Sequence, residues 1–440
     1  MNKTRAAFFT LGCKVNQYET EALKNIFRQK GYEIVDFSKE ADVYVINTCT
    51  VTHLSDRKSR QAIRRARKNN PRGLVAVVGC YAQLAWKKIK EIPGVDLIIG
   101  TQGKKEVLEL IEKAKERKDF YPLIEVKKLD EKVTFEEMPL EEVGRTRAFI
   151  KIEDGCEHFC SYCLVPYARG PVRSRKLEDL VKEVERLTTA GTKEIVLTGV
   201  NLGAYGKDSG EDLSLAVVIK RLERVPSLKR LRLSSLEPTD FTMELLEVLA
   251  DSAKVCHHLH IPLQSGDDYT LKRMNRLYTA DEYRKLVSYL RYLMPCLALT
   301  TDVMVGFPGE EEENFNNTCR FIEEMAFSRL HVFKYSPRTG TEAWSYANNL
   351  SPREKDRRSK KLTDLGKKMA AEYSKTFLGK EAEVLFEQER KLQEKGKKVL
   401  EGLSRHYQRV RAQAGRELIG EIGRVKIEEY DDGCLWGKLI

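Results

Sequence analysis

The sequence predicts an α/β protein of three consecutive parts: a parallel sheet covered by helices, an incomplete (β/α) barrel and a small antiparallel β-barrel. Apolar strands alternate with amphipathic helices at the start of the chain, as in sheets buried on both faces. The alternation restarts near Thr146, and the pattern changes to a period of two after Gly379. These observations predict units at residues 1–115, 146–376 and 377–440, with a charge-rich connector at 116–145.

Composition restricts the class of protein. The chain has 440 residues, 41% of them hydrophobic, and contains neither a long uncharged apolar run nor a signal-peptide pattern. We therefore expect a cytoplasmic protein without a membrane span. In a reducing compartment, its ten cysteines indicate metal binding or catalysis and not disulfides. The net charge of +11 favours a polyanionic partner, with nucleic acid first.

The first part reads as four strands, each followed by a turn or helix. Right-handed crossovers between parallel strands would make it flavodoxin-like. The expected strands are residues 6–12, 42–48, 74–79 and 96–100, and the expected helices are 18–31, 55–69 and 84–89.

Three cysteines come directly after three of these strands: Cys13, Cys49 and Cys80. The carboxyl ends of parallel strands share one edge of the sheet, where such folds bind ligands. The simplest interpretation is an iron–sulfur cluster with three protein ligands. The alternative is that each cysteine is a small residue filling a strand end.

The expected helix 55–69 is strongly basic. Its cations repel one another unless a polyanion offsets them, which predicts contact with nucleic-acid phosphates. A solvated helix face is the alternative. The candidate RNA-binding residues are Arg57, Arg64, Arg65 and Arg67.

In the second part, six strands alternate with helices, which is typical of a partial (β/α) barrel with its working residues at the carboxyl ends of the strands. His258 and His260 share one strand face, where packing or substrate contact is favoured over metal binding. The strands are 147–153, 194–199, 230–235, 258–264, 300–307 and 329–335. Candidate site residues at their ends are Gly199, Asn201, Ser235, Glu237 and Gln264, each of which has a turn or cap role as its alternative.

A polar loop after the first of these strands contains Cys156, Cys160 and Cys163 in the spacing C-x3-C-x2-C. Three thiolates on one loop can hold three corners of a cubane iron–sulfur cluster and leave the fourth iron open. Zinc would need paired C-x2-C units or histidines at set spacing, and His158 lies inside the loop, where ligation would strain it.

With aromatic Tyr162 before the last cysteine, this run resembles the signature of the radical S-adenosylmethionine (SAM) superfamily. The resemblance implies that the open iron is chelated by the amino and carboxyl groups of SAM. It also implies SAM contacts from Tyr162 and from the residues at the strand ends.

The last part, residues 377–440, reads as short strands joined by Gly turns after a basic helix that begins near Ser351. It resembles the TRAM domain of RNA-modifying enzymes, and oligonucleotide binding is a common use of small barrels. The alternative is a dimerisation or capping barrel.

The order of parts resembles the radical SAM methylthiotransferases along essentially the whole chain. TLGCKVNQYET and IEDGCEHFCSYCLVPYARGPVRSR are similar to the branch that acts on threonylcarbamoyladenosine in tRNA. The isopentenyladenosine branch has Gln-Met-Asn where this chain has Lys14-Val15-Asn16, and a third branch modifies a ribosomal-protein aspartate. The resemblance implies two [4Fe-4S] clusters, SAM, a tRNA anticodon stem-loop and an electron donor such as flavodoxin or ferredoxin.

The resemblance also implies the reaction. The cluster at Cys156, Cys160 and Cys163 reductively cleaves SAM to a 5′-deoxyadenosyl radical, and the cluster at Cys13, Cys49 and Cys80 supplies sulfur for a methylthio group on C2 of adenine. The alternatives are a radical SAM enzyme acting on a protein side chain and a non-catalytic RNA-binding iron–sulfur scaffold.

Overall fold

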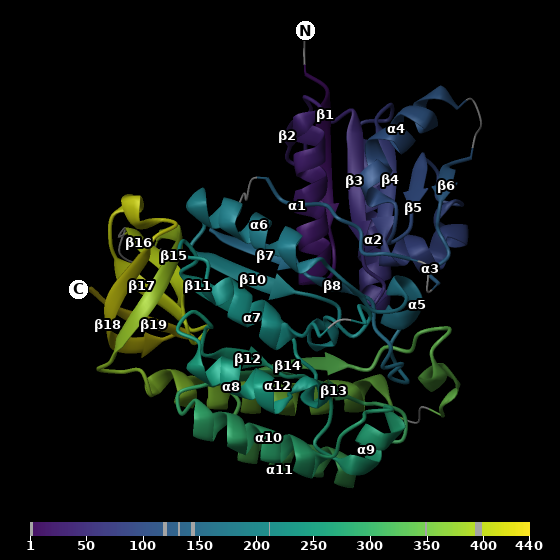
Figure 1. Cartoon of the computed structure of the whole chain (residues 1–440). Helices are drawn as coiled ribbons and strands as arrows, with labels where there is room; N and C mark the ends of the chain where they lie inside the picture. The colour runs from purple at the N-terminus through teal and green to yellow at the C-terminus, as the bar shows by residue number, and fades with distance from the viewer. Residues whose placement is uncertain are drawn as a thin grey trace.

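A computed structural model describes residues 3–117, 121–130, 133–141, 146–210, 212–347, 350–391 and 398–440. Figure 1 shows an N-terminal helix-covered sheet, a central arc of strands with helices outside it, and a C-terminal barrel at the opposite side from the N-terminal sheet. Within the described part of the chain, no helix has the length and apolar character that crossing a membrane requires.

The N-terminal sheet has six parallel strands in the order β2-β1-β3-β4-β5-β6. Its first five strands follow the order 2-1-3-4-5, which confirms the flavodoxin-like prediction. The second of them, at residues 33–35, was not among the four predicted strands. The strands are β1 (Arg5–Thr10), β2 (Glu33–Val35), β3 (Val43–Thr48), β4 (Leu74–Gly79), β5 (Leu97–Ile99) and β6 (Leu123–Glu125). The helices are α1 (Lys14–Gln29), α2 (His53–Asn69), α3 (Cys80–Ile89) and α4 (Val107–Glu116).

Strand β6 corrects one prediction, because it lies inside the range 116–145 that was expected to be a connector. Leu123 pairs with Leu97 and Ile124 with Ile98, so this short apolar stretch extends the sheet. Three residues in a charged context are too short for a periodicity signal, and the neighbouring strand β5 determines their conformation.

The central part contains six parallel strands, as predicted, in the sheets β11-β10-β7 and β12-β13-β14. Parallel bridges from Leu231 to Val255 and from Ser235 to His260 join the two sheets into one open arc. The strands are β7 (Arg147–Lys151), β10 (Glu194–Thr198), β11 (Arg230–Leu233), β12 (His258–His260), β13 (Ala298–Val305) and β14 (Arg329–Lys334). The helices outside them are α6 (Leu177–Thr189), α7 (Leu215–Glu223), α8 (Met243–Asp251), α10 (Ala280–Leu293), α11 (Glu312–Met325) and α12 (Pro352–Lys375).

Helix α12 is the basic helix that was expected to begin near Ser351. It packs on β14: Leu362 is fully buried in the main core, and a side chain at Gly366 would lie 3.0 Å from Leu330. The helix therefore completes the sixth β/α unit, and one of its cations, Arg358, is buried against Glu310.

The C-terminal strands form a closed barrel in the order β15-β16-β17-β19-β18. Strands β17 and β19 pair in parallel, which corrects the prediction of a wholly antiparallel barrel. Closure removes the free strand edges. The strands are β15 (Glu381–Lys391), β16 (Lys398–Ser404), β17 (Arg409–Gln413), β18 (Ile422–Asp431) and β19 (Cys434–Leu439).

This barrel covers the amino ends of the central strands. Arg147 pairs with Glu387 at 2.7 Å and Arg230 with Glu383 at 2.8 Å. The ring of Tyr407, in the turn between β16 and β17, stacks on His258 with centroids 4.5 Å apart. The carboxyl ends of the same strands remain free to form a site.

Candidate iron–sulfur and substrate site

Cys13, Cys49 and Cys80 meet at one edge of the N-terminal sheet because they follow the adjacent strands β1, β3 and β4. A side chain at Gly12, whose φ is +103°, would lie 3.1 Å from the Cys49 sulfur, so glycine is needed for this close approach. Cys13 caps the N-terminus of α1, and Cys80 is the first residue of α3. Helix N-termini favour anionic sulfur.

Cys156, Cys160 and Cys163 lie on the loop between the short strand β8 (Glu153–Asp154) and helix α5 (Val165–Arg169). Strand β8 pairs with β9 (Arg173–Ser174), which holds both ends of the loop. The Cys163 amide donates to the Cys160 carbonyl at 2.9 Å, and the Val165 amide donates to the Cys163 sulfur at 3.4 Å. The backbone thus fixes the loop before any metal binds.

Both triads fit iron–sulfur clusters better than single ions. Burial raises the pKa of Cys49 to about 11 and that of Cys156 to about 12, so these thiols need a nearby cation to ionise at neutral pH. Among the His, Cys, Asp and Glu side chains that the structure describes, one group of three has its ligand atoms within 4.8 Å of one another. That group is His260, Asp302 and His331, and it contains no cysteine. The cysteine triads are therefore wider than a tetrahedral zinc site, where Zn–S is about 2.3 Å. Each can hold a four-iron cluster with one iron open.

In each triad, one cysteine sulfur accepts a hydrogen bond from a buried arginine, and the arginine differs between the two triads. Arg169 Nε donates to Cys80 Sγ at 3.3 Å, and Arg276 donates to Cys160 Sγ at 3.3 Å. Hydrogen bonds to ligand sulfur raise a cluster's reduction potential. Neither arginine was predicted as a site residue, since nothing in the local sequence distinguishes either of them from a surface cation.

Arg169 also belongs to a buried ionic network beneath the two triads. Glu19 accepts from Arg169 at 2.6 Å and lies 2.8 Å from the Lys104 ammonium. Asp154, two residues before Cys156, lies 3.0 Å from the Lys151 ammonium and 3.2 Å from Arg169. The network ties the N-terminal sheet to the second cysteine loop, so it fixes the spacing between the two triads.

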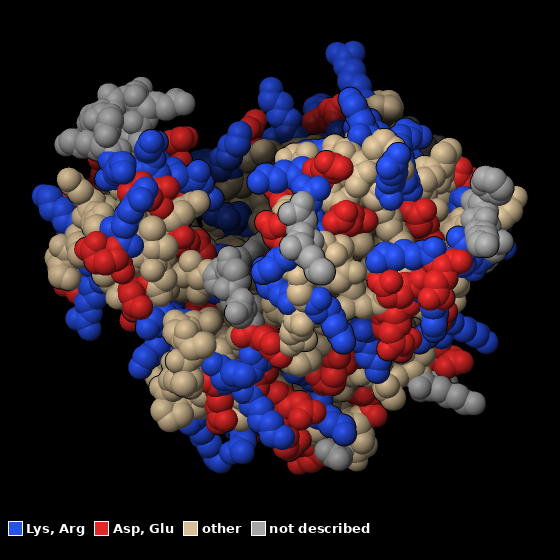
Figure 2. All heavy atoms as spheres, turned by 90° about the horizontal axis from the view of Figure 1, so that it is seen from above, with Lys and Arg blue, Asp and Glu red and all other residues tan. Residues whose placement is uncertain are grey.

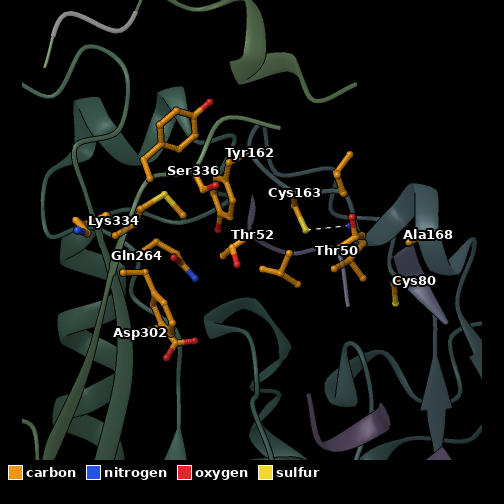
Figure 3. A pocket seen from close by; sticks show the side chains of 16 residues that line it. Thr50, Thr52, Cys80, Tyr162, Cys163, Ala168, Gln264, Asp302, Lys334 and Ser336 are labelled. Atoms are coloured by element: carbon orange, nitrogen blue, oxygen red, sulfur yellow. Dashed lines mark hydrogen bonds between the residues drawn. The ribbon is translucent and has the colours of Figure 1, made fainter. Parts of the chain in front are cut away.

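One cavity of about 200 Å³ reaches both triads, with Cys80 and Cys163 in its wall. In Figure 3, Gln264 and Asp302 lie at one side of this cavity, Cys80 lies at the opposite side, and Cys163 lies on the wall between them. A molecule in the cavity therefore contacts both cluster sites at once. The remaining wall residues are Thr50, Val51, Thr52, Tyr162, Leu164, Val165, Ala168, Met304, Phe333, Lys334, Tyr335 and Ser336.

The expected SAM contacts divide into two groups. Tyr162 and Gln264 line the cavity between the triads. On the other side of the loop, Glu237 forms an ion pair with Arg276 and lines a smaller pocket beside Cys160.

The other candidates lie around this second group. The Asn201 side chain lies 3.1 Å from the His158 ring, and a side chain at Gly199 would collide with Glu153. Ser235 is exposed and bridges to His260. Contact of all these residues with SAM stays a prediction.

Helix α2 exposes most of its predicted RNA-binding cations. Arg57, Arg64 and Arg65 are exposed, whereas Arg67 pairs with Asp96 at 2.8 Å and donates to the Gly94 carbonyl at 2.6 Å. The Arg67 guanidinium thus already has protein partners, and phosphate contact by any of the four arginines stays a prediction.

Comparison with known proteins agrees with this arrangement. Residues 5–100 match the uncharacterized protein family UPF0004, and residues 150–322 match the radical SAM superfamily. A threonylcarbamoyladenosine tRNA methylthiotransferase from Bacillus subtilis (strain 168) is 44% identical over 96% of this chain and 93% of its own length. A tRNA-2-methylthio-N(6)-dimethylallyladenosine synthase from Syntrophomonas wolfei is 36% identical over 98% of this chain and 96% of its own length.

Among solved structures, the radical SAM methyltransferase TsrM from Kitasatospora setae has a TM-score of 0.56 at 16% identity, over 76% of this chain and 75% of TsrM. The cobalamin-dependent SAM radical enzyme OxsB has a TM-score of 0.52 at 12% identity, over 84% of this chain and 56% of OxsB. These structures share the fold, and the full-length relatives establish the family. The chain belongs to the radical SAM methylthiotransferases.

Proposed function

We propose that the protein is a cytoplasmic tRNA methylthiotransferase that adds a methylthio group to C2 of N6-threonylcarbamoyladenosine beside the anticodon. The observation that carries this proposal is a cavity with a cysteine of each triad in its wall. The identity of the substrate base is supported by the 44% identity to the Bacillus subtilis enzyme, compared with 36% to the dimethylallyladenosine enzyme. Isopentenyladenosine is the alternative substrate.

Two [4Fe-4S] clusters and SAM would supply the radical and the transferred sulfur, and a flavodoxin- or ferredoxin-like donor would supply electrons. The chain's own residues hold and orient these groups. Cys13, Cys49 and Cys80 would hold one cluster, and Cys156, Cys160 and Cys163 the other.

A buried contact beside the cavity joins the two halves of the site. Arg338, after β14, donates to Thr50, which follows β3, and to Asp56 of α2 at 2.7 Å each, and all three side chains are buried. This contact places the loop after Cys49 opposite the cysteines of the second triad. An unstacked adenine from an anticodon loop would enter between them.

The substrate is tested by incubating reduced, cluster-reconstituted protein with SAM and tRNA that lacks methylthio groups, then analysing nucleosides by mass spectrometry. We expect a methylthio adduct on N6-threonylcarbamoyladenosine. An adduct on N6-dimethylallyladenosine alone would assign the alternative substrate, and no nucleoside adduct would contradict the proposal.

Changing Arg57, Arg64 and Arg65 together to Gln should weaken tRNA binding and make it less sensitive to salt. Each lost phosphate contact should reduce the slope of log affinity against log salt by about 0.7–0.9. The measurement is a tRNA titration at several salt concentrations. Lys182→Gln, at an exposed position of α6, is the control. An unchanged slope in the triple variant would show that these arginines form a solvated helix face and do not contact phosphates.

Ending the chain after Lys375 should leave cluster binding and SAM cleavage but sharply reduce tRNA modification, with partial recovery at low salt. The structure adds an expected fall in melting temperature, because Arg230 and Arg232 are buried against the C-terminal barrel. Light scattering and a tRNA titration are the measurements. A halved molecular mass with undiminished tRNA affinity would show that the barrel is a dimerisation module.

A further inference from the structure

The inside of the partial barrel contains a group of cations around one tyrosine. The Arg232 guanidinium lies 5.0 Å from the centre of the Tyr407 ring, Arg329 lies 5.9 Å from it, and Arg147 lies 6.0 Å from it. Lys14, the residue after Cys13, extends into the same space: its charged neighbours are Arg147, Arg232, Tyr407 and Asp302. Four cations, one from the first part of the chain and three from the second, thus meet around Tyr407 of the third part.

Two of these cations, Lys14 and Arg329, form no ion pair with any residue that the structure describes. Arg232 pairs with Glu194 at 2.7 Å, and Arg147 pairs with Glu387 at 2.7 Å. Lys14 is half-buried and Arg329 is exposed. Unpaired cations this close to two other arginines repel one another, and they are accessible to an anion that enters from solvent.

The lowered pKa of the Tyr407 hydroxyl indicates the same positive potential. Burial by itself would raise the pKa of its hydroxyl, but Lys14, Arg147 and Arg232 outweigh burial and lower that pKa. Figure 2 shows a hollow between the C-terminal barrel and the N-terminal domain, with Lys and Arg atoms along its walls. An anionic group entering there would meet a favourable field.

Asp302 connects this group of cations to the cavity between the cysteine triads. It lines that cavity and is also a charged neighbour of Lys14. The rings of His260 and His331 lie 3.4 and 3.3 Å from its carboxylate, and Thr300 lies 2.9 Å from the second ring nitrogen of His260. The carboxylate is therefore held at the cavity wall as a fixed hydrogen-bond acceptor.

The geometry of the base relates these features to the substrate. In adenine, C2 and C6 are both bonded to the ring nitrogen N1, and N6 is attached to C6, so a base that holds C2 between Cys80 and Cys163 keeps its N6 substituent inside the cavity. A threonylcarbamoyl group there carries one carboxylate, one hydroxyl and one free N–H. It needs a cation and an acceptor close together.

We propose that Lys14 and Arg329 form an anion-binding subsite for the RNA substrate, which takes the carboxylate of the N6 substituent, and that Asp302 accepts a hydrogen bond from its hydroxyl or N–H. This inference rests on the proposed function. The same anionic chemistry is also present in a backbone phosphate next to the target nucleotide, and the experiment distinguishes the two sources.

The test is equilibrium binding of holoprotein, without reductant, to two anticodon stem-loops that carry N6-threonylcarbamoyladenosine either as the acid or as its methyl ester. The wild type should bind the acid about ten- to a hundredfold more tightly than the ester, as expected for a charge-assisted hydrogen bond. Lys14→Gln should remove this difference, and Lys14→Arg should keep most of it. Lys30→Gln, an exposed lysine just after α1, is the matched control.

Because Lys14 adjoins Cys13, the iron content of each variant is checked, and Arg329→Gln tests the same subsite from the other domain. Equal weakening of acid and ester in both variants, with a shallower salt dependence, would assign the subsite to a backbone phosphate. Unchanged binding of both RNAs would overturn the proposal. These outcomes do not need turnover, so a failure of methylthiolation by the wild type would count against the proposed function separately.

Discussion

Cys156→Ala should abolish SAM cleavage, whereas Cys13→Ala should leave SAM cleavage intact and stop methylthiolation. The two cysteines belong to separate triads on separate elements, so each variant removes one ligand of one cluster site. Released 5′-deoxyadenosine measures SAM cleavage, and nucleoside mass spectrometry measures methylthiolation. Reconstituted wild type should hold about eight irons, and each variant about four.

Cys296→Ala is the matched control, because Cys296 is an exposed thiol remote from either triad in the sequence. It should keep both activities and the full iron content. Full methylthiolation by Cys13→Ala would show that the edge of the N-terminal sheet holds no essential cluster.

Glu19→Gln should destabilise the protein by about 3–5 kcal/mol, the usual effect of removing one partner from a buried ionic network. Glu19 is fully buried and lies 2.6 Å from Arg169, 2.8 Å from Lys104 and 3.5 Å from Lys151. The neutral amide leaves these three cations with Asp154 as their buried counter-ion. Denaturant unfolding of cluster-free protein measures the change.

Glu112→Gln, which breaks the exposed pair with Lys115 on α4, is the control and should change stability by less than about 1 kcal/mol. An equally small change for Glu19→Gln would show that the network is not an essential support of the fold.

The same residue predicts a pH dependence. Burial by itself would raise the pKa of Glu19, but Arg169, Lys104 and Lys151 outweigh it and lower the pKa to about 2 from an ordinary value of 4.5. A carboxyl group whose pKa is lower in the folded than in the unfolded chain stabilises the fold at any pH above its unfolded pKa. This stabilisation disappears as the pH falls from about 4.5 to about 2. It amounts to about 3 kcal/mol. The free energy of unfolding of Glu19→Gln should therefore fall less steeply over this range than that of the wild type, and parallel curves would contradict the assignment.

Sequence alone determined the layout of the three parts and the meeting of Cys13, Cys49 and Cys80. Both follow from local periodicity, because parallel strands bring their carboxyl ends to one edge whatever packs around them. The second triad was readable for a similar reason, since Cys156, Cys160 and Cys163 lie on one short loop.

Only the tertiary structure decided which charged residues pair with one another inside the protein. Periodicity distinguishes a buried face from an exposed one, but it does not reveal which distant side chain neutralises a given cation. Arg67 is bound by Asp96, and Arg169 is bound by Glu19 at a separation of 150 residues. Lys14 and Tyr407 come from opposite ends of the chain, and only the seating of the C-terminal barrel on the central strands brings them to one site.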